Sequence, residues 1–244
     1  MSATDQGKAI NALLKKLPRG DVQPPPADRT PIEELVYAFL LWESSTSRAD
    51  NAFKRCQQSF VDLNDLRVSR PREVEAALGK TYPRLEERVA RLQASLQEIY
   101  IREYEVSLDS LEALSKRDAR KYLESLEGIV PFVPARVMLF KCGAHAVPIE
   151  DRLLAKLIEL GVIDEGTDLA KAQGILERHI KAEQAEEACL KLQAFSEGAA
   201  EPTARSAKSS KSTTKKASKK RTTKKRSSKT STKKKTGRTK SKGS

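Results

Sequence analysis

The stretch that decides the fold is Leu126-Glu-Gly-Ile-Val-Pro-Phe-Val-Pro-Ala-Arg-Val-Met-Leu139. Before it, Ser115 is a good N-cap, and the apolar residues that follow Ser115 have helical spacing. Gly128 suits the left-handed position that ends a helix. Pro134 then opens a second, apolar helix that runs to about Cys142. The stretch therefore predicts two helices joined by a tight turn.

Helical patterns continue on both sides of this hairpin. One helix has a complete start signal, because Thr30 is an N-cap, Pro31 fits the first helical position and Glu33 closes a capping box. No stretch alternates as a strand does. We therefore predict an all-α fold of about nine or ten helices. Besides the helix opened at Thr30, the expected helices and turns cover residues 9–17, 47–61, 71–79, 83–104, 108–114, 115–126, 134–142, 151–160, 168–181 and 182–195.

Charge and composition divide the chain into three parts. The 244 residues carry a net charge of +13, but the last 44 hold 14 Lys, four Arg and one Glu, so the other 200 carry −4. We expect an N-terminal extension with a Pro-rich linker at 1–27, a helical domain at 28–198, and a basic tail at 199–244. The tail has no Leu, Ile, Val or aromatic residue. It cannot bury apolar surface, so we predict that it is disordered.

The tail predicts binding to an anionic polymer. Each Lys or Arg can neutralise a phosphate without reading sequence, and about ten such contacts give a salt slope on the order of −9 on duplex DNA. Stacking of bases on the tail is excluded, because it has no aromatic ring. A solubilising or targeting tail and a tail for acidic membranes are the alternatives. The candidate DNA-binding residues are Lys215, Lys216, Lys219, Lys220, Arg221, Lys224, Lys225, Arg226, Lys233, Lys234 and Lys235.

Metal and membrane functions find no support in the sequence. Cys56, Cys142 and Cys189 lie far apart and form no paired motif, which excludes a disulfide framework or a zinc ribbon and fits an intracellular compartment. His145 and His179 have no ligand-spaced companions. No apolar run reaches the ~18 residues of a membrane span. We expect no metal, no cofactor and no membrane partner.

The hairpin has the form of a helix–hairpin–helix motif. Such a hairpin exposes backbone N–H groups at the start of its second helix, where unpaired donors and the helix dipole attract a phosphate. This binding positions a backbone without reading bases. A plain helical hairpin gives the same pattern. The candidate contacts are Gly128, Ile129, Val130, Pro131, Phe132, Val133, Pro134 and Arg136.

Two further stretches carry a resemblance to a known family. After the hairpin comes Val147-Pro-Ile-Glu-Asp-Arg152, and upstream stands Leu40-Leu-Trp-Glu-Ser-Ser-Thr-Ser47. Together with the hairpin they resemble the endonuclease III family of helix–hairpin–helix DNA glycosylases, over about 170 residues from Asp28 to Phe195. That family has Leu-Pro-Gly-Val-Gly-Arg-Lys-Thr-Ala in the hairpin and Pro-Val-Asp-Thr-His before the next helix. The resemblance implies an endonuclease III-like fold and duplex DNA as partner.

The departures from the family concern its chemistry. The hairpin has no Lys, so the resemblance implies no Schiff-base lyase activity, and Lys141 is the nearest amine. Glu150 stands where the family has its catalytic Asp, about one methylene longer. Ser44 stands where much of the family has the Gln that enters the duplex after base flipping. Only Cys189 lies in the region of the family's four cluster-binding cysteines, so no iron–sulfur cluster is expected.

These observations favour a catalytically degenerate DNA-binding protein related to base-excision repair. Two alternatives remain open. One is a monofunctional glycosylase that uses Glu150 and needs no Lys. The other is a nucleoid or chromatin architectural protein in which the basic tail dominates. Protein partners cannot be inferred from the sequence.

Overall fold

The structure is a computed structural model, and it describes residues 3–18 and 20–198. These residues form eleven α-helices, two short 3-10 helices (η1 and η2) and no strand, which confirms the all-α prediction. The basic tail at 199–244, with its predicted DNA-binding lysines and arginines, lies outside the described residues. The elements are α1 (Ala3–Lys16), α2 (Pro31–Leu41), α3 (Thr46–Ser59), α4 (Leu63–Val68), α5 (Pro71–Leu78), α6 (Leu85–Glu103), η1 (Asp109–Ala113), α7 (Lys116–Glu124), α8 (Phe132–Phe140), α9 (Asp151–Glu159), α10 (Leu169–His179), η2 (Ala182–Gln184) and α11 (Ala185–Ser196).

The structure differs most from the sequence prediction at three helices. Helix α4 was not predicted, because its six residues, capped by Asp62, are too few to show a helical period. Helix α1 begins several residues earlier than expected. Helix α8 begins at Phe132 rather than Pro134. Its first turn accommodates Pro134, since the N–H groups of a first turn have no intrahelical partner.

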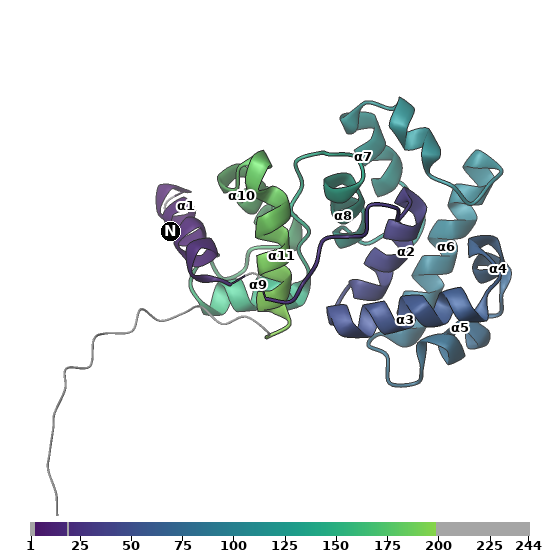
Figure 1. Cartoon of the computed structure of the whole chain (residues 1–244). Helices are drawn as coiled ribbons and strands as arrows, with labels where there is room; N and C mark the ends of the chain where they lie inside the picture. Colours follow the sequence, from purple (N-terminus) through teal and green to yellow (C-terminus); the bar gives the residue numbers. More distant parts are fainter. Residues whose placement is uncertain (1–2, 19, 199–244) are drawn as a thin grey trace, which may run out of the picture. The chain divides into compact units, whose positions relative to one another are not determined.

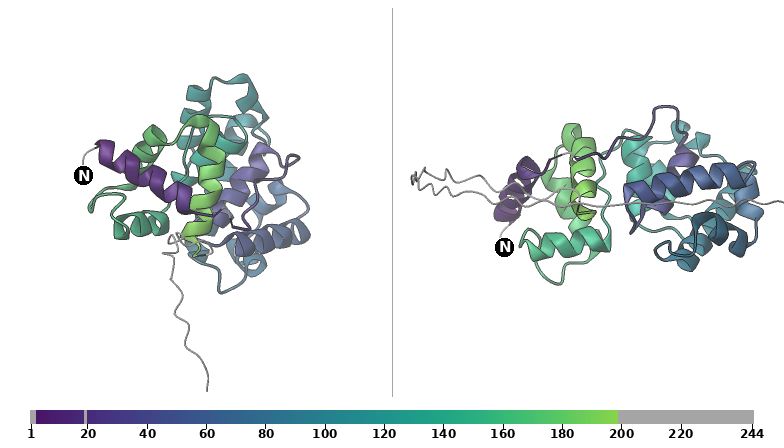
Figure 2. Two further views of the ribbon diagram at one scale, coloured as in Figure 1. Left: turned by 60° about the vertical axis from the view of Figure 1, so that its left-hand side comes forward. Right: turned by 60° about the horizontal axis from the view of Figure 1, so that its bottom comes forward.

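The helices form two groups within the described residues. Helices α2 to α8 pack together, and α1, α9, α10 and α11 form the second group, as the right-hand view of Figure 2 shows. Helix α8 contacts both α2 and α11, and so it joins the groups (Figure 1). Helix α1, expected as part of an extension, buries Ile10, Leu13 and Leu17 and packs against α10 and α11. No described helix combines the length and hydropathy that a bilayer crossing needs.

Helix α2 is buried on every side, and its polar groups are matched by arginines. The Glu34 carboxylate is fully buried and accepts hydrogen bonds from Arg136 Nε at 2.7 Å and Arg29 Nη1 at 3.0 Å. Arg136 was predicted to contact DNA, and this prediction is wrong because its side chain is only 3% exposed and serves Glu34. Breaking such a buried pair on one side leaves a charge without compensation.

The C-terminal end of α2 is held from α6. Arg88, which is fully buried, donates to the carbonyl oxygens of Phe39, Trp42 (2.5 Å) and Pro83, and Tyr82 Oη donates to Leu40 O at 2.8 Å. These bonds satisfy carbonyls that have no partner inside the helix. Burial lowers the pKa of Arg88 to about 10. The chain that leaves α2 is thereby fixed in place.

The hairpin between α7 and α8 lies directly on α6. Gly128 has φ +74, as predicted for a left-handed position, and its carbonyl accepts from Arg91 Nη1 at 3.3 Å. A Cβ at Gly128 would lie 2.8 Å from the carbonyl oxygen of Arg91. Ser95 Oγ donates to the Glu127 carbonyl at 2.7 Å. Only glycine fits here, both for its conformation and for its close approach.

A pair of Gly→Ala variants tests this packing. Gly128→Ala should lower the free energy of unfolding by about 1–3 kcal/mol, because it adds strain at positive φ and a backbone clash. Gly174→Ala is the control, since that residue lies inside α10 with nothing within 4 Å, and it should raise stability by about 0.5–1 kcal/mol. Urea unfolding measures both. Equal stability of Gly128→Ala and wild type would contradict the described hairpin.

Candidate functional site

The turn between α2 and α3 lies at the centre of the candidate site. Trp42 (φ −50, ψ 123) and Glu43 (φ +52) occupy the middle of a type II turn, closed by a hydrogen bond from Ser44 N to Leu41 O at 2.8 Å. The second middle position of this turn favours glycine, so Glu43 is strained. Trp42 is buried. Contacts from outside the turn must therefore hold Glu43 in this conformation.

Glu150 supplies part of that restraint. It is the N-cap residue of α9, but its side chain does not cap the backbone N–H groups of that helix. Instead, Oε2 accepts from the Glu43 backbone N–H at 2.5 Å, and Oε1 accepts from Ser196 Oγ at 3.1 Å. The carboxylate therefore bonds to the α2–α3 turn and to α11 at the same time.

Arg152 completes the cluster. Its Nε lies 3.0 Å from Glu150 Oε1, and its Nη2 donates to the same oxygen and to the Ser44 carbonyl at 2.8 Å. Its backbone N–H donates to a Glu43 carboxylate oxygen at 3.3 Å, so Glu43 caps α9 from outside. We call Glu43, Ser44, Glu150, Arg152 and Ser196 the Glu150 network.

A second carboxylate reinforces the same turn. Glu197, which follows α11, accepts from the N–H and the hydroxyl of Thr46 at 2.9 and 2.6 Å. Thr46 is the first residue of α3, so Glu197 satisfies a free donor at that helix start. Neither Arg152 nor Glu197 was predicted from the sequence as a site residue. For Arg152 a signal existed, because it stands two residues after Glu150 at the predicted start of a helix.

Burial and the neighbouring donors shift the pKa of Glu150 in opposite directions. Its side chain is 1% exposed, and desolvation raises its pKa above the ordinary value, while the Arg152 guanidinium and the Glu43 N–H act in the other direction. The Glu43 N–H bonds to one of its oxygens, and the Arg152 guanidinium and the Ser196 hydroxyl bond to the other. Ser44, a candidate DNA-binding residue from its position in the family resemblance, is 2% exposed, so its side chain is not presented at the surface.

The hairpin offers some of the expected donors. Within the described part of the chain, the N–H groups of Gly128, Val130 and Phe132 donate to no backbone carbonyl, whereas Val133 N donates to Val130 O at 2.9 Å. Pro131 has no N–H to offer. These three N–H groups lie between Gly128 and the first residue of α8, where they could donate to a phosphate oxygen.

Most of the predicted hairpin side chains are not at the surface. Pro131 is exposed and Gly128 and Ile129 are half-buried, while the side chains of Val130, Phe132, Val133 and Pro134 are buried. Contacts by the hairpin must therefore come mainly from its backbone. The predicted contacts themselves remain a proposal.

Charges of both signs surround the hairpin. Glu124 and Glu127 are exposed beside it and disfavour an anion. Arg117 and Lys121 are exposed one turn apart on α7 and make no ion pair among the described residues. Lys141, the nearest lysine after the hairpin, lies just past the far end of α8, and its Nζ donates to the Pro26 carbonyl at 3.2 Å. Its amine is not placed at the hairpin.

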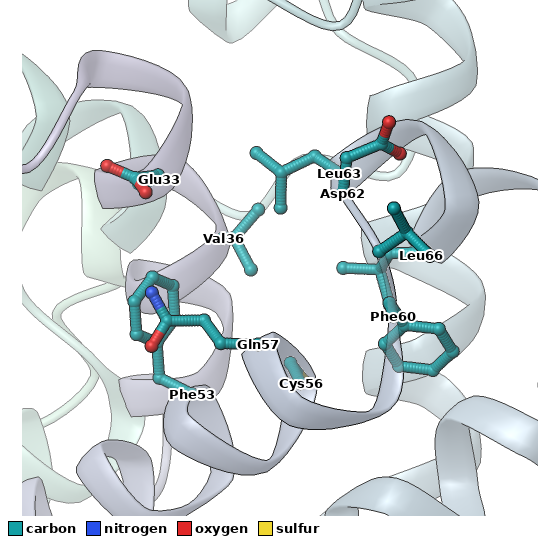
Figure 3. A pocket seen from close by; sticks show the side chains of 10 residues that line it. Glu33, Val36, Phe53, Cys56, Gln57, Phe60, Asp62, Leu63 and Leu66 are labelled. Atoms are coloured by element: carbon teal, nitrogen blue, oxygen red, sulfur yellow. The ribbon is translucent and has the colours of Figure 1, made fainter.

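A separate cavity of about 300 Å³ lies between α2, α3 and α4 (Figure 3). Its walls are mostly apolar. Glu33 is engaged in the α2 capping box and Asp62 caps α4. Burial raises the pKa of Cys56 to about 11, so its thiol stays protonated near neutral pH. The cavity offers no activated nucleophile. The described residues also contain no group of three or more His, Cys, Asp or Glu side chains placed to hold a metal ion.

Comparison with known proteins places the fold. No protein-family model matches the chain, and curated protein sequences give no significant match. Solved structures do match. Endonuclease III in a trapped covalent DNA complex has a TM-score of 0.61 at 15% identity, with 80% of this chain and 86% of that chain covered.

Two other solved structures agree. The Clostridium acetobutylicum 8-oxoguanine glycosylase/lyase, bound to duplex DNA, has a TM-score of 0.58 at 14% identity, covering 82% of this chain and 71% of that one. A thermostable thymine-DNA glycosylase has a TM-score of 0.55 at 17% identity, covering 80% and 88%. The chain therefore has the endonuclease III-like fold of these DNA glycosylases, as the sequence motifs predict.

The Glu150 network predicts a specific pattern of stability. Arg152→Met leaves a buried carboxylate without its cation, which should cost about 2–3 kcal/mol at pH 7, somewhat below a fully buried pair because Arg152 is 29% exposed. The variant should regain stability as the pH falls. A carboxyl whose folded pKa exceeds its unfolded pKa binds its proton more tightly when folded, so stability rises as pH drops through the folded value.

The double variant Glu150→Gln/Arg152→Met removes both charges and should recover part of the loss. Arg178→Met, on the exposed side of α10, is the control and should change stability by less than about 0.5 kcal/mol. Urea unfolding between pH 5 and 7.5 measures all four proteins. A pH-independent loss in Arg152→Met would mean that Glu150 is not the group left uncompensated.

Proposed function

We propose that this protein binds duplex DNA through its phosphates, as a catalytically degenerate form of the DNA glycosylase fold with a role related to base-excision repair. The proposal rests mainly on the burial and the hydrogen bonds of Glu150. The sequence resemblance assigns Glu150 to the position of the family's catalytic carboxylate. Both of its oxygens are bonded inside the protein and its side chain is buried. A carboxylate so engaged cannot approach a sugar carbon without breaking the network.

The binding part of the proposal rests on two features. The hairpin from Gly128 to Phe132 has three N–H groups that donate to no backbone carbonyl, and these are the donors proposed to bind a phosphate. The tail adds a net charge of +17 over 44 residues, which supplies affinity without base readout. The hairpin positions the duplex and the tail supplies most of the binding free energy, since the rest of the chain has a net charge of −4.

A monofunctional glycosylase is the second candidate. The raised pKa of Glu150 favours it, because a carboxyl with a raised pKa can act as a general acid. Such an enzyme needs no lysine in the hairpin. It would, however, have to release Glu150 from Arg152 when DNA binds.

Base excision distinguishes the two candidates. Wild type and Glu150→Gln are incubated with duplexes that each carry one damaged or mismatched base, and abasic products are revealed with alkali. We expect no product from either protein, together with intact duplex binding by wild type. Product formed by wild type and lost in Glu150→Gln would establish a glycosylase and contradict degeneracy.

Salt dependence tests the role of the tail. The slope of log K against log salt for a 20-base-pair duplex should be about −9 for the full chain, if about ten phosphates are neutralised. Deleting residues 201–244 should remove most of this slope. A full-length variant with its tail lysines replaced by glutamine should behave like the deletion. Equal affinity of the deletion and the full chain at moderate salt would contradict the proposed division of roles.

A further inference from the structure

An exposed apolar surface lies where α4 meets the C-terminal end of α6. Val68, Tyr100, Ile101 and Tyr104 are 61%, 37%, 56% and 85% exposed. Together with Arg67 we call them the tyrosine–arginine patch. Surface side chains of this size are normally scattered singly, and a cluster of them on one helix end indicates an interaction site.

The patch is held together by stacking. The Arg67 guanidinium lies over the Tyr100 ring, with 4.0 Å between its carbon Cζ and the ring centroid. Arg67 donates to the side chains of Asn64 and Gln97, both neutral, so its charge is not cancelled by a carboxylate. A guanidinium on an aromatic face, with its charge available, is a typical surface for a nucleobase and its phosphate.

Tyr104 shows strain that its own contacts do not explain. It ends α6 in the left-handed conformation, with φ +58, where glycine is favoured. A non-glycine residue there costs about 1–2 kcal/mol. Its ring is 85% exposed, so packing does not offset that cost. Strain of this kind is commonly retained where a side chain serves binding.

Unpaired cations continue from the patch along the chain. Arg70 and Arg72 follow Val68 closely, and both are exposed. Neither these two nor Arg67 forms an ion pair within the part of the chain that the structure describes. The Arg67 guanidinium, which bonds to neutral side chains and lies on the Tyr100 ring, favours a polyanion with aromatic groups over a neutral apolar surface.

We infer that the tyrosine–arginine patch is a second nucleic-acid site, which stacks unpaired bases of single-stranded DNA. The inference rests on the proposed function and extends it from duplex phosphates to exposed bases. Helix α6 separates the two sites. At 100° per residue, Arg91 and Ser95, which contact the hairpin, lie on the opposite side of α6 from Gln97, which contacts Arg67. The patch therefore binds its strand independently of the hairpin.

A protein partner is the competing occupant. A stable protein interface takes about 20–30 residues from each side. The patch has five residues, and the charge of Arg67 suits a phosphate. Binding of bases is therefore the stronger interpretation.

The test uses the full-length protein and a fluorescent single strand of 20 nucleotides. Fluorescence anisotropy is measured at about 0.3 M salt, which weakens the contribution of the tail. A matched strand of 20 abasic units has the same phosphates and no bases. Wild type should bind the strand with bases at least tenfold more tightly than the abasic strand, since one stacked base gives a factor of this order.

Tyr104→Gly separates binding from folding. It removes the ring and also relieves the positive φ, so its thermal stability should equal or exceed that of wild type. Its preference for bases over abasic units should fall about tenfold, and Tyr100→Leu should show a similar fall. Tyr104→Phe should keep the preference. Leu160→Ala, at another exposed apolar position, is the control and should keep it as well.

Two results would overturn the inference. One is equal affinity of wild type for the two strands, and the other is an unchanged preference in both tyrosine variants. In either case the patch serves another partner, such as a protein. Duplex binding measured in the same buffers keeps the two proposals distinguishable. If wild type shows no preference for bases but still binds the duplex, only the second site is contradicted. If wild type shows no salt-dependent duplex binding, the proposed function itself is contradicted.

Discussion

The compensation of the buried Glu150 carboxylate is the constraint on which the arrangement of the two helix groups depends. A carboxylate withdrawn from water must find strong donors or lose its charge. Here the donors come from three places in the chain: the Glu43 N–H in the α2–α3 turn, Arg152 at the start of α9, and Ser196 at the end of α11. Because a type II turn with Glu43 at positive φ is unfavourable alone, these bonds and the turn stabilise each other.

The same principle recurs at the other buried charges. Arg88 satisfies carbonyls at the end of α2, and Arg136 pairs with Glu34 in the middle of that helix. Arg88 therefore fixes α6 against α2, and Arg136 fixes α8 against α2. Helix α2 in turn leads into the α2–α3 turn. Apolar packing brings α2, α6 and α8 together, but packing alone does not define how far each helix slides or turns. The directional bonds of the arginines define these positions. Replacing both partners of such a pair with apolar residues could preserve stability while losing this alignment.

Sequence reasoning predicted most of the fold because the helices carry local signals. The capping box at Thr30 and the left-handed Gly128 are examples, and both are present in the structure. The site was harder, because its partners are distant in sequence. Nothing near Ser44 indicates that Arg152 will bond to its carbonyl, and Arg136 has the same local appearance as an exposed cation. Helix α4 was missed for a different reason, since six residues show less than two turns of periodicity.

The separation of charge between the tail and the rest of the chain limits what each can contribute to binding. At physiological salt the screening length is about 8 Å, so under the proposed function any long-range attraction of DNA comes from the concentrated charge of the tail. The helical part, with a net charge of −4 and exposed Glu124 and Glu127 beside its hairpin, attracts DNA weakly at a distance. Its backbone donors and aromatic rings act only in contact. These short-range contacts, unlike the attraction by the tail, depend on the structure of the bound nucleic acid. Under the proposed function, the tail would therefore set how often DNA is encountered, and the helical domain would determine which local geometry of that DNA is retained.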